Sequence, residues 1–222
     1  MQQLMKNFSG TKKLDSEQMA GFSVDFLLAG YETTANTLSY TTYLLAMNPD
    51  VQEKLQAEID QYFEEEPEIS LYEAAQNLKY LDMVLKESLR LYTPVPKVMR
   101  QCSKTVTVGG VTIPEGAGVV IPIDVIHHLP QYWPDPYKFD PERFTVEAEA
   151  NRHQLAHMPF GWGPRSCLGM RFALLETKIA LMEILRKYSF ARGPETPALL
   201  DLERGFTTVP KGGVYVKIIP RK

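Results

Sequence analysis

The feature that most constrains the fold of this chain is a ten-residue stretch, residues 160–169, with the sequence FGWGPRSCLG. Two glycines and a proline at its centre favour a tight, irregular loop. An apolar-periodic pattern then covers residues 168–188 and predicts a long helix. The stretch therefore predicts a loop that ends in Cys167, directly at the start of a helix.

The position of this cysteine suggests a chemical role. The first backbone N–H groups of a helix have no partners within the helix, so we expect them to favour the thiolate form of Cys167. Gly169 leaves the first turn without a side chain, so that a flat, bulky ligand can approach. A thiolate that faces a flat ligand is typical of an axial ligand to haem iron. The alternative is a core cysteine that packs as a small hydrophobic residue, but such a cysteine needs no Gly-Pro-Arg loop.

The same stretch resembles the cysteine-ligand loop of the cytochrome P-450 superfamily, the haem-thiolate monooxygenases, with its pattern F-x-x-G-x-R-x-C-x-G. Every fixed position is matched, by Phe160, Gly163, Arg165, Cys167 and Gly169. The resemblance implies a haem cofactor whose iron takes the Cys167 thiolate as its protein ligand. It also implies that Phe160 and Gly169 shape the haem-binding loop and that Arg165 meets a haem propionate.

A second motif lies at the centre of a long helical pattern that covers residues 15–47. Glycine and threonine are poor choices in mid-helix, so this centre predicts a local opening of the hydrogen-bond ladder. The motif resembles the oxygen-side helix pattern [AG]-G-x-[DE]-T-[TS] of the same superfamily. The resemblance implies that Glu32 and Thr33 handle protons near dioxygen and that Gly30 gives room. Without the cysteine loop, a buried helix that tolerates two threonines would be the better explanation of this motif.

A third motif lies in a predicted helix over residues 78–92. Glu87 and Arg90 are three positions apart on the side opposite its apolar stripe, so their side chains can meet. A surface ion pair is the alternative to a buried one. The buried interpretation is favoured because the sequence resembles the family's E-x-x-R motif. Residues 140–144 resemble its P-E-R-F motif, and the resemblance implies that Arg143 joins the pair in a structural network behind the haem.

Arg100 follows a Pro-containing break, on a segment that we expect to be extended. Its distance from Arg90 resembles that of a family arginine that meets a haem propionate, and guanidinium is a natural carboxylate partner. A plain surface charge explains Arg100 alone equally well. Residues 95–99 would line the substrate side in such a fold.

Short β runs occur in the second half of the chain. Residues 105–108 and 111–113 flank Gly109-Gly110 and predict a hairpin, and residues 119–123 and 214–219 predict two further strands. His127 and His128 are neighbours on a predicted helix, where their side chains point in different directions. We therefore interpret them as structural or exposed and not as a metal pair.

Composition and length narrow the class of protein. The chain has 222 residues, a net charge of −3 and two cysteines, which argues against nucleic acid as a partner and against a disulfide framework or a four-ligand zinc site. No run approaches the ~18 apolar residues of a membrane span. Members of the superfamily are normally more than twice as long. We therefore expect a mainly α fold with small β-sheets, with residues 1–14 as a loose N-terminal segment of a fragment and residues 15–222 as the haem-binding C-terminal half.

The resemblance implies a monooxygenase that inserts one oxygen atom of dioxygen into a lipophilic substrate, such as a steroid, a fatty acid or a xenobiotic. It also implies an NADPH-dependent flavoprotein reductase as electron donor, and an endoplasmic reticulum membrane location for the full-length protein, whose anchor lies outside this chain. We expect the chain alone to be inactive.

Two alternatives remain. Residues 30–32, 163–169 and 210–215 resemble an endoperoxide-isomerase branch of the superfamily, whereas residues 169–173 resemble a steroid- and drug-oxidising branch. Thr33 favours the monooxygenase over the isomerase. The chain could also be a truncated, non-catalytic haem-binding remnant.

Overall fold

In this computed structural model, residues 15–221 are described, and the segment of residues 1–14 that we expected to be loose lies outside them. The chain divides into two compact units, residues 1–32 and residues 33–222. Helix α2 (Ser16–Met47) contributes to both of them. In the first unit the large apolar side chains of this helix, among them Phe22 and Leu27, are exposed.

The fold is mainly α with small β-sheets, as predicted. Within residues 15–221 the other helices are α3 (Pro49–Glu65), α4 (Leu71–Asn77), α5 (Lys79–Leu91), α6 (Ile123–His127), α7 (Val146–Ala150) and α8 (Met170–Leu185). The same residues also form the 3₁₀ turns η1 (Pro141–Phe144), η2 (Gln154–Ala156) and η3 (Gly163–Arg165). None of the helices within residues 15–221 is long and apolar enough to cross a membrane.

Local sequence explains where several of these helices begin. Pro49 occupies the first position of α3, where its missing N–H would have no helical partner in any case. Helix α4 begins with a capping box in which the Ser70 hydroxyl accepts the Glu73 N–H (3.2 Å). This short helix was not predicted, although the Ser-x-x-Glu spacing at its start is a recognisable signal.

Helix α2 is α-helical without interruption over its whole length, so the predicted local opening around Thr33 is wrong. The threonine hydroxyls of this region instead bond to carbonyls of their own helix. The Thr37 hydroxyl donates to the Thr33 carbonyl, and the Thr41 hydroxyl donates to the Thr37 carbonyl, both at 2.8 Å. Such bonds satisfy the hydroxyls without displacing the backbone N–H donors from the ladder.

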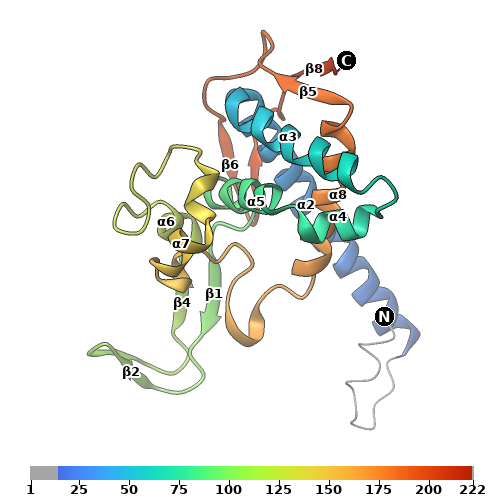
Figure 1. Cartoon of the computed structure of the whole chain (residues 1–222). Helices are drawn as coiled ribbons and strands as arrows, with labels where there is room; N and C mark the ends of the chain where they lie inside the picture. The colour runs from blue at the N-terminus through green and yellow to red at the C-terminus, as the bar shows by residue number, and fades with distance from the viewer. Residues whose placement is uncertain (1–14, 222) are drawn as a thin grey trace. The chain divides into compact units, whose positions relative to one another are not determined.

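The hydrophobic core of the second unit lies between helices. Figure 1 shows α3, α4, α5 and α8 close together. Their apolar faces and the C-terminal part of α2 supply the fully buried side chains, which include Tyr40, Leu45, Leu55, Ile59, Leu81, Leu181 and Leu185. A smaller cluster around Trp133 and Phe144 packs beside η1.

Four two-stranded antiparallel sheets complete the second unit. They pair β1 (Val98–Gln101) with β4 (Gly118–Ile121), β2 (Val106–Val108) with β3 (Val111–Ile113), β5 (Tyr188–Ala191) with β8 (Lys217–Pro220), and β6 (Leu202–Arg204) with β7 (Thr208–Pro210). The predicted hairpin is present, with Val108 opposite Val111, and Figure 1 shows it extending away from the helices. The predicted C-terminal strand begins later, at Lys217, and its partner β5 was not predicted.

The start of α5 depends on a distant carboxylate. Its N-cap residue Leu78 offers no side-chain acceptor, so the first N–H groups need another partner. Glu58 on α3 supplies it, because its two carboxylate oxygens accept the N–H groups of Tyr80 (2.7 Å) and Leu81 (3.0 Å). A negative charge at this end of the helix is also favourable for the helix dipole.

We predict that Glu58→Ala lowers the free energy of unfolding by about 1–2 kcal/mol, the usual cost of losing an N-terminal cap. Denaturant titration of the whole protein that contains this chain measures the change. Glu53→Ala is the matched control, because Glu53 lies exposed on the same helix, and it should have little effect. Equal stability of the two variants would contradict the capping role.

Candidate functional site

The Cys167 loop is closed by short backbone hydrogen bonds. The Cys167 N–H donates to the Phe160 carbonyl (2.8 Å), and the Ser166 N–H donates to the Gly163 carbonyl (3.0 Å). Gly161 and Gly163 have φ values of 71° and 78°, in the left-handed region that only glycine adopts readily. The sequence forms a tight loop here because these two positions are glycine.

Helix α8 begins at Met170, with Gly169 as its N-cap residue. We predicted that this helix begins at about residue 168, directly after Cys167. A short turn formed by Leu168 and Gly169 instead separates Cys167 from the helix. The Ala173 N–H donates to the Gly169 carbonyl (2.9 Å), which is the first bond of the helical ladder. Cys167 lies in the loop before the helix, and its own N–H is already used within that loop.

Cys167 is an exposed free thiol in this loop. Large apolar side chains beside it are also exposed, Trp162 by 57%, Leu168 by 73% and Phe172 by 69%. A Cβ atom built on Gly169 would meet no atom within 4 Å, so the space above the start of α8 is open. An accessible thiol can serve as a ligand to haem iron, and the open space with its apolar neighbours fits the flat, apolar ring of a haem.

Two exposed arginines could bind the carboxylates of such a ligand. Arg165 ends η3 in the cysteine loop, and Arg100 lies on β1, where its guanidinium donates to the Met99 carbonyl (2.8 Å). Within residues 15–221, neither guanidinium pairs with a carboxylate. Both charges therefore remain available for haem propionates, which are bound well by paired guanidinium N–H groups.

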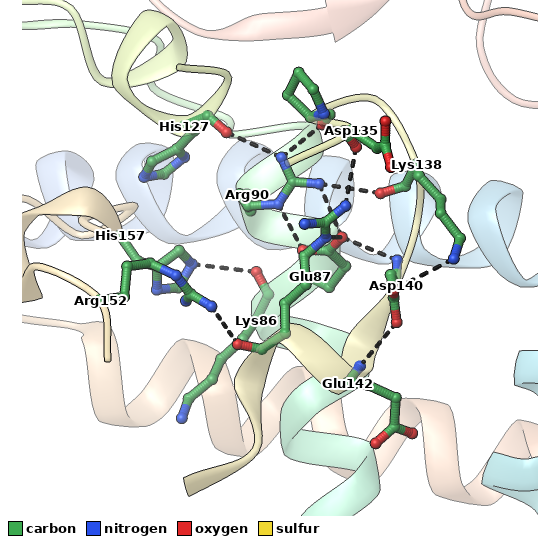
Figure 2. A network of polar contacts seen from close by, with 12 residues as sticks. Lys86, Glu87, Arg90, His127, Asp135, Lys138, Asp140, Glu142, Arg152 and His157 are labelled. Carbon is green, nitrogen blue, oxygen red and sulfur yellow. Dashed lines mark hydrogen bonds and ion pairs between the residues drawn. The ribbon is translucent and has the colours of Figure 1, made fainter. Parts of the chain in front are cut away.

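Glu87 and Arg90 form a fully buried ion pair on α5. Arg90 Nε donates to Glu87 Oε2 (2.6 Å) and Arg90 Nη2 donates to Glu87 Oε1 (2.8 Å), and both side chains are 0% exposed. The apolar core on one side of α5 and the segment that leads to η1 on the other exclude water from this pair. Figure 2 shows the two side chains at the centre of a larger set of polar contacts.

The remaining hydrogen-bonding capacity of the pair is met by backbone groups. Arg90 donates to three carbonyls, those of His127 (2.9 Å), Pro136 (2.7 Å) and Lys138 (3.2 Å). Glu87 Oε1 accepts the Asp140 N–H (3.0 Å). Burial raises the pKa of Glu87, and the hydrogen bonds and positive charge of Arg90 oppose that rise.

Arg143 on η1 lies next to this pair. Its Nε atom is 3.4 Å from Glu87 Oε1, which is an ion-pair distance, and its Nη2 atom donates to the Asp135 carbonyl (2.9 Å). The structure thus brings together Glu87, Arg90 and Arg143. We call these three residues the buried network.

Sequence reasoning missed several side chains that surround the buried network. The Arg152 guanidinium lies 3.9 Å from the centre of the Trp133 ring, and that of Arg90 lies 5.0 Å from it. The rings of His127 and His157 are stacked, with centroids 5.2 Å apart. No local pattern indicates these contacts, because their partners are far apart in the sequence.

Burial favours the neutral form of both stacked histidines. Burial, together with the positive charge of Arg90, lowers the pKa of His127 to about 3. Burial also holds the pKa of His157 well below its usual value, because its ring is enclosed by those of His127, Trp133 and Phe144. The contacts of His128 are different from those of His127: its ring stacks on that of Tyr137, and its Nδ1 atom bonds to the Asp124 carbonyl (2.8 Å).

Glu32 and Thr33 both lie on α2. Glu32 is the last residue of the first unit and is exposed, whereas Thr33 is the first residue of the second unit and is half-buried. The Thr33 carbonyl accepts the Thr37 hydroxyl.

Comparison with known proteins identifies relatives along almost the whole chain. The family model described as Cytochrome P450 matches residues 1–216. Thromboxane-A synthase of Sus scrofa is 46% identical over 211 residues, which are 95% of this chain and 40% of the relative. Thromboxane-A synthase of Rattus norvegicus is 44% identical over 213 residues, 96% of this chain and 40% of the relative. Cytochrome P450 3A16 of Mus musculus is 42% identical over 216 residues, 97% of this chain and 43% of the relative.

These relatives confirm the likenesses found in the motifs. The endoperoxide-isomerase branch that the motifs resemble is that of thromboxane synthase, and both this branch and a cytochrome P450 3A protein are among the matches. The chain spans about 40% of the length of these relatives.

We predict that Glu87→Ala leaves little haem-loaded protein. Removing one partner of a buried ion pair typically costs ~3–5 kcal/mol, because the other charge stays buried and unpaired. The yield of folded protein and its haem content after purification measure the effect. Glu183→Ala is the control, because Glu183 forms surface pairs with Arg186 and Lys187, which are worth under ~1 kcal/mol. A stable, haem-replete Glu87→Ala protein with merely slow turnover would contradict a structural role.

Proposed function

Because this chain belongs to the cytochrome P450 family, we propose that it is the haem-binding part of a haem-thiolate monooxygenase. The reaction inserts one oxygen atom of dioxygen into a lipophilic substrate such as a steroid, a fatty acid or a xenobiotic. The observation that carries the proposal is the Cys167 loop, in which an exposed free thiol stands over an open helix start. Packing of a hydrophobic core does not require a loop of this form, whereas the loop leaves space for a ligand with a flat ring.

The side chains of the loop have distinct roles in this proposal. Cys167 would bind the haem iron as a thiolate, and Phe160 and Gly169 would shape the haem-binding loop. Arg100 and Arg165 would bind the propionates through paired N–H bonds. Once bound, the haem supplies the oxygen chemistry, which belongs to the cofactor and not to the protein.

Proton supply is the role proposed for Glu32 and Thr33. A threonine hydroxyl can both accept and donate a hydrogen bond, so it can pass a proton to dioxygen without carrying charge itself. A nearby carboxylate such as Glu32 can replace that proton from solvent. Their adjacent positions on α2 support this division of work.

The buried network has no chemical step of its own. Glu87 and Arg90 are fully buried, and their hydrogen bonds join them to each other and to backbone groups. Arg143 adds an ion-pair contact to Glu87 and a hydrogen bond to the Asp135 carbonyl. We propose that the network fixes the shape of the chain that carries the Cys167 loop.

The setting of the chain follows from the same proposal. Residues 15–222 would form the C-terminal half of a longer protein, in keeping with the 40% coverage of its relatives. The partners would be a lipophilic small molecule, dioxygen and an NADPH-dependent flavoprotein reductase, and the whole protein would lie at the endoplasmic reticulum membrane. Nucleic acid has no part in it.

A thromboxane-synthase-like endoperoxide isomerase is the second candidate, favoured by the 46% identity to Thromboxane-A synthase of Sus scrofa. The peroxide substrate of an isomerase already contains the O–O bond, so the enzyme needs neither proton delivery nor a reductase. Thr33 favours the monooxygenase. A truncated, non-catalytic haem-binding remnant is the third candidate, and an in-frame upstream half in the transcript would exclude it.

We predict that Cys167→Ser abolishes the red-shifted Soret band that thiolate-ligated haem gives when reduced and exposed to carbon monoxide. The absorption spectrum of the whole protein measures this directly. Cys102→Ser is the matched control, because Cys102 is the other cysteine of this chain, and it should leave the band unchanged. If the Cys167→Ser protein retained the band, Cys167 would not be the ligand.

We predict that Thr33→Ala leaves haem binding intact but diverts reductant into hydrogen peroxide, so that less product forms per electron consumed. The measurement compares product formed with nicotinamide cofactor oxidised, with and without reductase. Ser39→Ala is the control, because Ser39 lies on the same helix and its hydroxyl donates to the Ala35 carbonyl (2.8 Å). Rapid endoperoxide turnover without reductase, unaffected by Thr33→Ala, would overturn the monooxygenase in favour of the isomerase.

A further inference from the structure

We propose that His127 is a positioning residue that holds the start of the Cys167 loop in place. The inference rests on the proposed function, because it gives the loop a thiolate that must be held toward a haem. His127 Nε2 accepts the backbone N–H of Met158 at 2.9 Å. His127 is 0% exposed and Met158 is 9% exposed, so no water competes for this bond.

His127 also receives a bond from the buried network through its backbone. Arg90 Nη1 donates to the His127 carbonyl at 2.9 Å, while the same guanidinium grips Glu87. Figure 2 shows the His127 carbonyl turned toward Arg90 and its ring extending the other way. One residue thus has its backbone fixed by the buried network and its ring fixed on the chain that leads into the loop.

On the other side of Met158 the bonds continue toward Cys167. The Gly161 N–H donates to the Met158 carbonyl (2.9 Å), and the Cys167 N–H donates to the Phe160 carbonyl (2.8 Å). Residues 159–161 are half-buried, and residues 162–170 are exposed. Among the described residues, the bond from the Met158 N–H to His127 Nε2 is the buried side-chain bond that lies nearest before this exposed stretch.

The ring is suited to this task only in one form. Because Met158 donates, Nε2 must carry the lone pair, so the proton of the neutral ring is on Nδ1. The stack on His157 fixes the plane of the ring. His157 is itself held, since its Nε2 atom donates to the Lys86 carbonyl on α5 (3.2 Å).

A pair of substitutions separates the hydrogen bond from the packing. His127→Phe keeps an aromatic ring of similar size and can keep the stack on His157, but it removes the acceptor. His127→Gln replaces the ring with a side chain whose amide oxygen can reach the same N–H. His128→Phe is the matched control, because His128 bonds to Asp124 and stacks on Tyr137, not on the loop.

The primary measurement is amide hydrogen exchange in the whole protein, which needs no turnover. We expect residues 158–167 to exchange about five- to tenfold faster in His127→Phe, as loss of one ordinary hydrogen bond implies, while α5 is unchanged. His127→Gln should restore slow exchange, and His128→Phe should match the wild type. In carbon monoxide spectra, His127→Phe should have a smaller fraction of haem with the red-shifted band, and His127→Gln should recover it.

Other results would overturn the inference. Unchanged exchange of residues 158–167 in His127→Phe would show that the bond does not hold the loop. Wild-type exchange in His127→Phe together with fast exchange in His127→Gln would show that the ring acts through packing alone. If exchange responded as expected but Cys167→Ser retained the red-shifted band, the anchor would stand and the proposed haem ligand would be wrong.

Discussion

The second unit depends on one interaction, the fully buried ion pair between Glu87 and Arg90. Moving two charges out of water costs several kcal/mol per ion, and their attraction compensates only if every remaining donor and acceptor is also bonded. Here three backbone carbonyls and one backbone N–H complete the set. Those backbone groups belong to residues 127–140, so this irregular segment must take one particular path around α5.

That dependence explains why a segment with so little regular structure is well defined. Residues 128–140 contain no helix or strand, and a loop of this length is usually poorly fixed. Arg90 replaces the missing ladder, because its fork offers several donors in a rigid plane. The Trp133 ring, against which Arg90 and Arg152 both lie, adds apolar contact area to the same segment. The exposed Cys167 loop contrasts with it, since its order comes from glycine geometry and a few backbone bonds.

The parts of the structure that were predictable from sequence are those set by neighbours along the chain. Pro49 fixed the start of α3, and the three-residue spacing of Glu87 and Arg90 indicated that they meet. The short strands β5, β6 and β7 were not predictable, because each has only three or four residues and is defined by its pairing with a partner strand. The cap that Glu58 provides and the bond between His127 and Met158 join residues over 20 positions apart, so no local pattern contains them. Helix α8 begins at Met170 and not at about residue 168, because apolar periodicity does not distinguish a short turn from the first residues of a helix.

The buried ion pair also has a consequence for the order of events during folding. Glu87 and Arg90 are three residues apart, so they meet as soon as α5 forms, while both are still surrounded by water. The backbone groups that complete the pair are 37 to 53 residues away in sequence, and bringing them in requires the closure of long loops, which is slower. When residues 127–140 dock, water must therefore leave the two charges while backbone groups replace the hydrogen bonds that it made. A nascent chain that pauses before residue 127 lacks all of these backbone partners, so it would keep this pair hydrated.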